Sequence, residues 1–315
     1  MKKLASILIV LLLGLTFAQV NFPLTIVEAN GVELTFDAPP ERVVCLDFLC
    51  MQNMAFLDIP PLALGEALMI PAADPAFFGE AAEDIESVPS RPDIDWEAVA
   101  ALEPDLIMGW RGWRETAEVI APFYAHFYGD DTLESYTIDL RLTAALLGVD
   151  EAEIESRIQP VFDRADAYAE SIPQDLFIMI TFPRDDRGSE WRSNPNYSTC
   201  GVLEAFGSCP SEFENGNVSI EGMLELNPDV LVIENYDNVE LNQILEALDD
   251  DPLWPELNAH NSERILALPV QIARPDNMIS LQLWLDTVLP AIYPDIFPDG
   301  PLTDEQVQEI LAENQ

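Results

Sequence analysis

Two stretches of the same design decide the fold: AALEPDLIMG at residues 100–109 and MLELNPDVLVI at residues 223–233. Each starts with apolar residues at helical spacing, passes through a Pro-Asp pair and ends in a short apolar run. A helix, a turn marked by proline and a buried strand are therefore expected twice. Strands that alternate with helices in this way indicate parallel sheets covered on both faces, so we expect an α/β fold.

A further apolar run opens each half of the chain, RVVCLDF at 42–48 and DLFIMITF at 175–182. Between the halves, residues 142–172 form a long helical pattern that Pro160 is expected to kink. We therefore expect two lobes, each with a central, mostly parallel sheet flanked by helices, joined by one long connecting helix. The expected bounds of the first lobe, the connecting helix and the second lobe are 19–142, 143–172 and 173–315.

The N-terminus has the three parts of a secretory signal peptide. Lys2 and Lys3 precede the apolar run LASILIVLLLGL, and the small residues TFA end at Ala18. We expect residues 1–18 to be removed on export. The apolar run is too short to indicate a membrane span, and no cysteine near the cleavage point indicates a lipid anchor. The mature protein is expected to be a soluble, extracytoplasmic monomer, periplasmic where the cell has a periplasm.

The charge balance excludes one class of partner. The chain has 57 acidic and 14 basic residues, for a formal net charge of -43. Loss of Lys2 and Lys3 with the signal leaves 14 − 2 = 12 basic residues, all of them arginine. Such a chain repels nucleic acid and anionic lipid, so we expect neither as a partner. Most of the acidic residues are expected to form a solvated surface.

The four cysteines are expected to form disulfides, because an exported protein meets an oxidising compartment. Three pairings are possible, and we expect the two local ones, Cys45 with Cys50 and Cys200 with Cys209. Metal binding by cysteine is the weaker alternative, since no C-x-x-C motif occurs.

Several short motifs, taken in their order along the chain, resemble the periplasmic solute-binding proteins of ABC importers for ferric siderophores, haem and vitamin B12. They are GVELTFDAPPERVVCL at 31–46, LEPDLI at 102–107, LLG at 146–148, VLEAFG at 202–207, LNPDVLV at 226–232, DPLWPELNA at 251–259 and RILALP at 264–269. The resemblance implies two α/β lobes joined by a rigid helix, a ligand held in a shallow cleft between them, and delivery to a membrane permease. Cys45 and Cys200 would then lie on facing lobes, which argues against a disulfide between them.

The ligand-binding residues are expected in the loops that follow the strands, because open α/β sheets bind ligands beyond the carboxyl ends of their strands. Six of the twelve mature arginines fall in these loops, and guanidinium groups bind carboxylates, phenolates and phosphates through paired hydrogen bonds. Flat aromatic side chains in the same loops suit a bulky ligand. The candidates are Asp47, Trp110, Arg111, Trp113, Arg114, Phe182, Arg184, Arg187, Trp191, Arg192, Tyr197, Tyr236 and Arg274. Alternatively, the arginines pair with neighbouring acids and the aromatic rings pack at the ends of the strands.

These candidate residues leave three possible classes of ligand. The arginines favour an anionic ferric siderophore, which is the first choice. The W-R-G at Trp110 resembles the same motif in vitamin B12-binding members of the family, where the tryptophan packs against the ligand. Haem would need an axial ligand, and Tyr197 and Tyr236 are the candidates.

The resemblance also implies one glutamate on each lobe that docks on arginines of the permease. Glu221, in NVSIEGML at 217–224, matches the second-lobe position. Glu115 matches the first, with Glu118 as the alternative.

We expect no enzymatic activity and no cofactor. The sequence has no G-x-S-x-G, no H-E-x-x-H and no phosphate loop, and only His126 and His260 could assist catalysis or metal binding. An exported hydrolase acting through paired carboxylates is a remote alternative. Direct capture of bare zinc or manganese is another, since oxygen ligands alone can form such a site.

Overall fold

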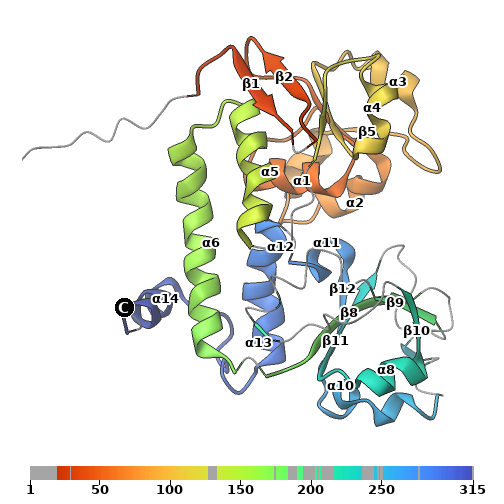
Figure 1. Ribbon diagram of the computed structural model, residues 1–315, viewed down its shortest axis with the longest axis vertical. Helices are drawn as coiled ribbons and strands as arrows, with labels where there is room; N and C mark the ends of the chain where they lie inside the picture. The colour runs from red at the N-terminus through yellow and green to blue at the C-terminus, as the bar shows by residue number, and fades with distance from the viewer. Residues whose placement is uncertain are drawn as a thin grey trace, which may run out of the picture.

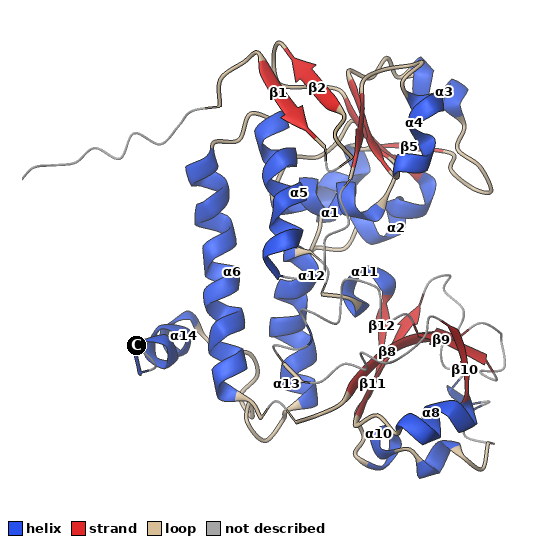
Figure 2. Cartoon of the chain, viewed as in Figure 1, coloured by secondary structure: helices blue, strands red, loops and turns tan. Residues whose placement is uncertain are grey.

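The computed structural model describes residues 20–28, 30–126, 133–173, 175–183, 190–193, 203, 206–207, 216–235, 245–246, 248, 251–275 and 277–313. The expected signal peptide, the candidates Arg184, Arg187, Tyr197 and Tyr236, and the pair Cys200 and Cys209 lie outside these residues. Figure 2 shows the strands gathered in two separate groups, with one long helix, α6, running alongside both. The expected α/β fold of two lobes and a long helix is confirmed.

The N-terminal lobe is built on a five-stranded sheet in the order β5-β4-β3-β6-β7, with all neighbours parallel. A two-stranded antiparallel sheet, β1-β2, stands beside it. The elements are β1 (Leu24–Val27), β2 (Glu33–Phe36), β3 (Val43–Cys45), α1 (Phe48–Phe56), β4 (Ala63–Gly65), η1 (Glu66–Leu68), α2 (Met69–Ala72), η2 (Gly79–Asp84), β5 (Glu86–Val88), α3 (Trp96–Ala101), β6 (Leu106–Gly109), η3 (Arg111–Trp113), α4 (Arg114–Ala117) and β7 (Phe123–Ala125).

The C-terminal lobe has a mixed sheet in the order β10-β9-β8-β11-β12. Strands β8, β11 and β12 are parallel, whereas β9 and β10 add an antiparallel edge. The elements from the connecting helices onward are α5 (Leu133–Leu146), α6 (Glu151–Ser171), β8 (Ile178–Pro183), β9 (Glu190–Ser193), β10 (Gly216–Ser219), α8 (Ile220–Leu226), β11 (Val230–Asn235), η4 (Trp254–Glu256), α10 (Asn258–Asn261), β12 (Ile265–Pro269), α11 (Val270–Ala273), α12 (Met278–Leu283), η5 (Trp284–Val288), α13 (Leu289–Ile292) and α14 (Asp304–Glu313).

The aspartate of the repeated Pro-Asp motif makes the same kind of hydrogen bond in both lobes. The carboxylate of Asp105 accepts hydrogen bonds from the backbone N–H groups of Glu41 and Arg42, just before β3. The carboxylate of Asp229 accepts one from the N–H of Phe177, just before β8. Each aspartate therefore accepts hydrogen bonds from backbone donors at the start of the central strand of its sheet.

The connection between the lobes is two helices rather than one. Helix α5 ends at Leu146, Gly148 takes a positive φ of 78°, and α6 then runs through Pro160 to Ser171. The break therefore falls at the glycine, which adopts a left-handed conformation without steric cost. Helix α6 continues past Pro160 as a single helix.

A helix of the second half also fastens the lobes together. Met278, Leu281 and Trp284 join a hydrophobic core with α6, and Ile279 is buried in the core of the N-terminal lobe with Met51 and Met54 of α1. Figure 1 shows α12 alongside α6 and below the end of α5. The two lobes therefore share buried apolar surface in addition to the covalent connection.

The expected disulfide between Cys45 and Cys50 is confirmed, and it joins the end of β3 to the first turn of α1. Among the described residues, no helix is both long enough and apolar enough to cross a membrane.

Candidate functional site

The strand order places a candidate site on the N-terminal lobe. From the central strand β3 the chain proceeds outward through β4 and β5, then returns to β6 on the other side of β3. In open α/β sheets such a switch point leaves a crevice beyond the carboxyl ends of the two strands. Asp47 follows β3 and Trp110 follows β6. These two residues therefore flank the position where the fold favours ligand binding.

In the W-R-G-W-R stretch at 110–114, the first tryptophan and arginine are exposed, whereas the second tryptophan and arginine pack against the lobe. Trp110 is 48% exposed, and its ring lies over Gly112, where an added Cβ would come within 2.1 Å of the ring. Trp113 is half-buried and packs edge-on against Trp110, with ring centroids 5.9 Å apart. Only Trp110 thus offers a large open face, and Gly112 is required for its position.

The two arginines divide in the same way. Arg114 pairs with the buried carboxylate of Glu28 and with Glu118, and it lies over the ring of Phe123. Arg111 is exposed, and its guanidinium has no hydrogen bond or ion pair with any residue that the structure describes. Arg114 therefore serves the lobe itself, whereas Arg111 can bind a ligand.

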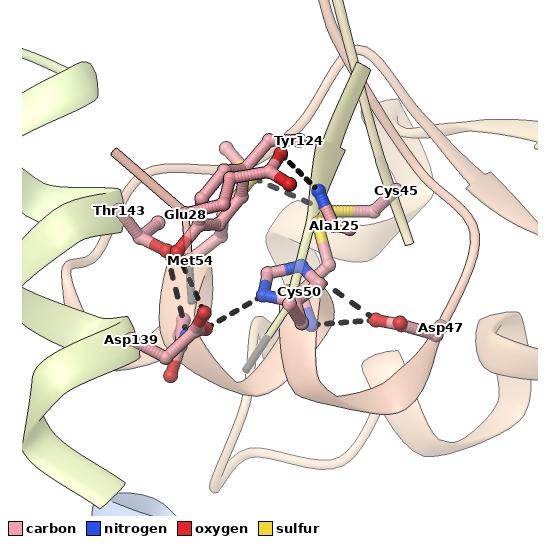
Figure 3. A network of polar contacts seen from close by, with 11 residues as sticks. Glu28, Cys45, Asp47, Cys50, Met54, Tyr124, Ala125, Asp139 and Thr143 are labelled. Atoms are coloured by element: carbon pink, nitrogen blue, oxygen red, sulfur yellow. Dashed lines mark hydrogen bonds and ion pairs between the residues drawn. A yellow bond between two sulfur atoms is a disulfide. The ribbon is translucent and has the colours of Figure 1, made fainter. Parts of the chain in front are cut away.

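A buried polar cluster underlies the switch point (Figure 3). His126, at the end of β7, lies 2.6 Å from Asp139 of α5 through Nδ1 and 3.7 Å from Asp47 through Nε2. Asp139 also accepts hydrogen bonds from Tyr124 and Asn53. Burial disfavours the imidazolium, but the carboxylates of Asp139 and Asp47 outweigh it and raise the pKa of His126 to about 9. His126 is therefore a buried cation at neutral pH.

Asp47 connects this cluster to the surface. Its carboxylate accepts a hydrogen bond from the backbone N–H of Cys50 and so caps α1. The side chain retains 10% of its surface exposed. The Cys45–Cys50 disulfide closes the same turn. Both constraints fix where the Asp47 carboxylate lies.

On the C-terminal lobe, Arg192 occupies the comparable edge. It pairs across the sheet with Phe182, one residue from the carboxyl end of β8. The side chain of Arg192 is half-buried and forms no hydrogen bond or ion pair within the described part of the chain. Phe182 is also half-buried. These two residues therefore lie beside each other near the strand end.

Trp191 does not lie on a ligand-facing loop, contrary to expectation. It is completely buried on the other face of β9 and stacks on Trp254, with centroids 6.4 Å apart and an interplanar angle of 5°. Because side chains alternate across a strand, placing Arg192 on one face sends Trp191 into the core. Trp191 is a core residue.

Arg274 is also held by the protein. Its guanidinium forms paired hydrogen bonds with Glu234, near the end of β11, and the Glu234 side chain is only 2% exposed. A buried carboxylate without this partner would be strongly destabilising. The first role of Arg274 is therefore to compensate Glu234.

The two candidate docking glutamates are both exposed, on α4 and at the start of α8. The Ser219 hydroxyl lowers the pKa of Glu221, which keeps that carboxylate charged. Glu118 is engaged by Arg114, so Glu115 is the more available acid on the first lobe.

Sequence reasoning missed Glu28, Asp139 and His126 as contributors to this region. No local motif identifies them, because they converge from β1, α5 and β7. Within the described residues, no group of three or more histidine, cysteine, aspartate or glutamate side chains has a metal-binding arrangement.

Comparison with known proteins agrees with this geometry. Residues 63–272, more than half of the chain, match the family model described as periplasmic binding protein. The chain is a member of the periplasmic binding protein family. The match extends from β4 of one lobe to α11 of the other, so it spans both lobes of the binding protein.

Individual members of the family cover most of this periplasmic binding protein. The Fe(3+) dicitrate-binding periplasmic protein FecB of Escherichia coli is 22% identical over 78% of this chain and 82% of its own. A periplasmic binding protein from Veillonella parvula has a TM-score of 0.72 at 18% identity, covering 90% of this chain and 96% of its own. An ABC-type Fe3+-hydroxamate transport system protein from Saccharomonospora viridis has a TM-score of 0.69 at 20% identity, covering 88% and 99%. The structural similarity establishes the shared fold, and the family consists of binding proteins rather than enzymes.

Proposed function

We propose that this periplasmic binding protein captures a ferric siderophore with net negative charge and delivers it to the permease of an ABC importer. The observation that carries the proposal is the placement of Arg111 and Arg192. Each lies near a strand end of its own lobe without a described protein partner. Two such guanidinium groups suit an anion held between the lobes.

The lobes are arranged in a way that supports this proposal. Figure 1 shows α1, which follows β3, on the side of the N-terminal lobe that faces the other lobe. Helix α11, which follows β12, lies on the opposing side of the C-terminal lobe. The carboxyl ends of both parallel sheets are thus directed toward the space between the lobes. The name of FecB, an Fe(3+) dicitrate-binding relative, supports a ferric carboxylate as the ligand.

Vitamin B12 is the second candidate, and the exposed ring of Trp110 favours it. A large apolar face next to a single arginine suits a neutral corrin ring as well as an iron chelate. Haem ranks third, because it needs an axial ligand, for which Tyr197 and Tyr236 are the candidates.

Several further assignments belong to the same proposal. Residues 1–18 act as a signal peptide, and the mature protein is a soluble extracytoplasmic monomer. The lobes and connecting helix have the bounds 19–142, 143–172 and 173–315. Glu115 and Glu221 dock on the permease. Arg184 and Arg187 add positive charge to the site.

Tryptophan fluorescence titration of the mature protein against ferric dicitrate, other ferric siderophores, cyanocobalamin and haemin tests the proposal. The expected result is saturable binding of an anionic ferric chelate that is recovered chemically intact. Arg111→Ala should weaken that binding by about tenfold or more, as removal of a charge-assisted hydrogen bond does. Arg42→Ala, on the opposite end of the β3 strand, is the control and should bind normally. Binding of cyanocobalamin alone would overturn the siderophore assignment in favour of vitamin B12.

A further inference from the structure

His126 lies directly beside the proposed ligand position and has no part in the function described so far. Its backbone N–H donates a 3.3 Å hydrogen bond to the carbonyl of Gly109, the residue before Trp110. Its Nε2 atom is buried, is directed toward Asp47 at 3.7 Å, and has no hydrogen-bond partner among the described residues. His126 thus contacts the ends of both strands that form the switch point, β6 through its backbone and the region after β3 through its imidazole.

The charged and titratable groups around His126 come from every element packed against it. They are Glu28 after β1, Asp47 before α1, Tyr124 on β7 and Asp139 on α5. Arg114 pairs with Glu28 and compensates that carboxylate. His126 is therefore a cation that Asp47 and Asp139 share.

The charge state of this histidine sets the charge of the cluster. With a pKa of about 9, His126 carries a positive charge at pH 7. Two carboxylates and one imidazolium then sum to one negative charge, whereas a neutral residue at 126 would leave two. The uncompensated charge would be shared by Asp139, the nearer partner of His126, and Asp47, which lies at the exposed side of the cluster. A unit charge within a few ångströms of a bound anion is expected to change its affinity by about tenfold.

We propose that His126 is a positioning residue for anion capture: its imidazolium offsets Asp47 at the switch point, so that the N-terminal lobe accepts a negatively charged ligand beside Trp110 and Arg111. The inference rests on the proposed function, because it assigns the charge class of the ligand at that site. His126 does not touch the ligand. It acts through Asp47.

A double-mutant cycle at pH 7, with ferric dicitrate as the probe, tests this role. His126→Gln makes the cluster more negative by one charge, Asp47→Asn makes it less negative by one, and the double variant restores the original charge. Affinity should fall about tenfold in His126→Gln, rise in Asp47→Asn and return to within about threefold of the wild type in the double variant. Asparagine still caps α1, so Asp47→Asn preserves the turn. His260→Gln is the matched control and should leave binding unchanged.

A merely structural role for His126 would not be rescued by a change at Asp47. Equal affinity of His126→Gln and the wild type, or no rescue in the double variant, would overturn the inference. If His126→Gln does not fold, nitrogen NMR of the wild-type imidazole decides, with His260→Gln used for assignment. A doubly protonated ring at pH 7 supports the inference, and a neutral ring overturns it. Failure of the wild type to bind any anionic ferric chelate would instead overturn the proposed function, while the NMR result would still report the charge of the cluster.

Discussion

The two lobes share a framework but differ in how they hold buried charge. Asp105 and Asp229 anchor the starts of corresponding central strands in the same way. At the strand ends the lobes diverge. Glu234 of the C-terminal lobe is compensated by Arg274, whereas Asp47 and Asp139 of the N-terminal lobe share His126.

This difference has a functional consequence. An arginine keeps its charge at every accessible pH, whereas a histidine can lose it. Among the described residues, the N-terminal strand ends can therefore change charge as the pH rises through about 9, and the Glu234 pair cannot. The two lobes share the same order of strands in their sheets. The cation that pairs with the buried carboxylates determines whether the charge at each strand end changes with pH.

The largest expected effect on stability comes from removing Arg274, the cation that keeps its charge at every accessible pH. Arg274→Ala leaves the carboxylate of Glu234 buried without its partner, which should lower the free energy of unfolding by about 3 to 5 kcal/mol. Urea denaturation followed by circular dichroism measures the change. The double variant Glu234→Gln with Arg274→Ala removes the orphaned charge and should regain part of the loss. A loss below about 1 kcal/mol in the single variant would contradict the conclusion that the buried Glu234 carboxylate needs Arg274 as its partner.

The titratable cation should make stability depend on alkaline pH. The pKa of His126 is raised to about 9 in the folded protein from an ordinary value of 6.5, so the folded state binds this proton more tightly. Its contribution is fully present below pH 6.5 and is lost as the pH rises through about 9. The shift corresponds to a stability change on the order of 3 kcal/mol. Unfolding in urea between pH 6 and 10 should show this decline in the wild type, and His126→Gln should show a flatter profile.

The shared framework predicts similar losses in the two lobes. Asp105→Ala and Asp229→Ala each remove the acceptor of backbone donors at the start of a central strand. Because the hydrogen bonds to Asp105 are exposed and the one to Asp229 is only partly buried, each variant should lose about 0.5 to 1.5 kcal/mol. Denaturant midpoints of the two variants measure this. A large loss for one variant with none for the other would show that the motif is repeated in sequence but not in its structural role.

The smallest expected effect separates the two partners of Arg114. Glu118 is half-exposed, so Glu118→Gln should lower stability by about 0.2 to 1 kcal/mol. Glu28 is buried and also accepts a hydrogen bond from the backbone N–H of Ala125, so Glu28→Ala should cost several times more. Thermal unfolding of both variants makes the comparison, and equal losses would contradict it.

The fold could be predicted because its signals are local. The Pro-Asp repeat and the apolar runs at 106–109 and 230–233 specify helix, turn and buried strand without reference to the rest of the chain. The docking of α12 on the N-terminal lobe could not be predicted, because an apolar helix such as 278–283 fits any core. Pattern alone does not indicate which lobe buries Ile279.

The candidate site was only partly predictable for the same reason. Sequence places Arg111 and Arg114 in one loop, but Glu28, which engages Arg114, is distant in sequence. His126 carries no local motif, and its partner Asp139 lies thirteen residues further along, within α5. Trp191 and Arg192 are neighbours, and only strand pairing determines which of them enters the core. The sequence shows which residue types lie in each loop. Whether a given side chain is buried, paired or available to a ligand depends on contacts between distant parts of the chain.

The central claim is that an anionic ferric chelate binds at the N-terminal switch point, between the lobes. The most direct test is an anomalous difference map at the iron edge from crystals of the protein grown with ferric dicitrate. The expected result is an iron peak beyond the carboxyl ends of β3 and β6, with the chelate in contact with Trp110 and Arg111. An iron peak on another face of the protein, or none in crystals that contain the chelate at saturating concentration, would contradict it.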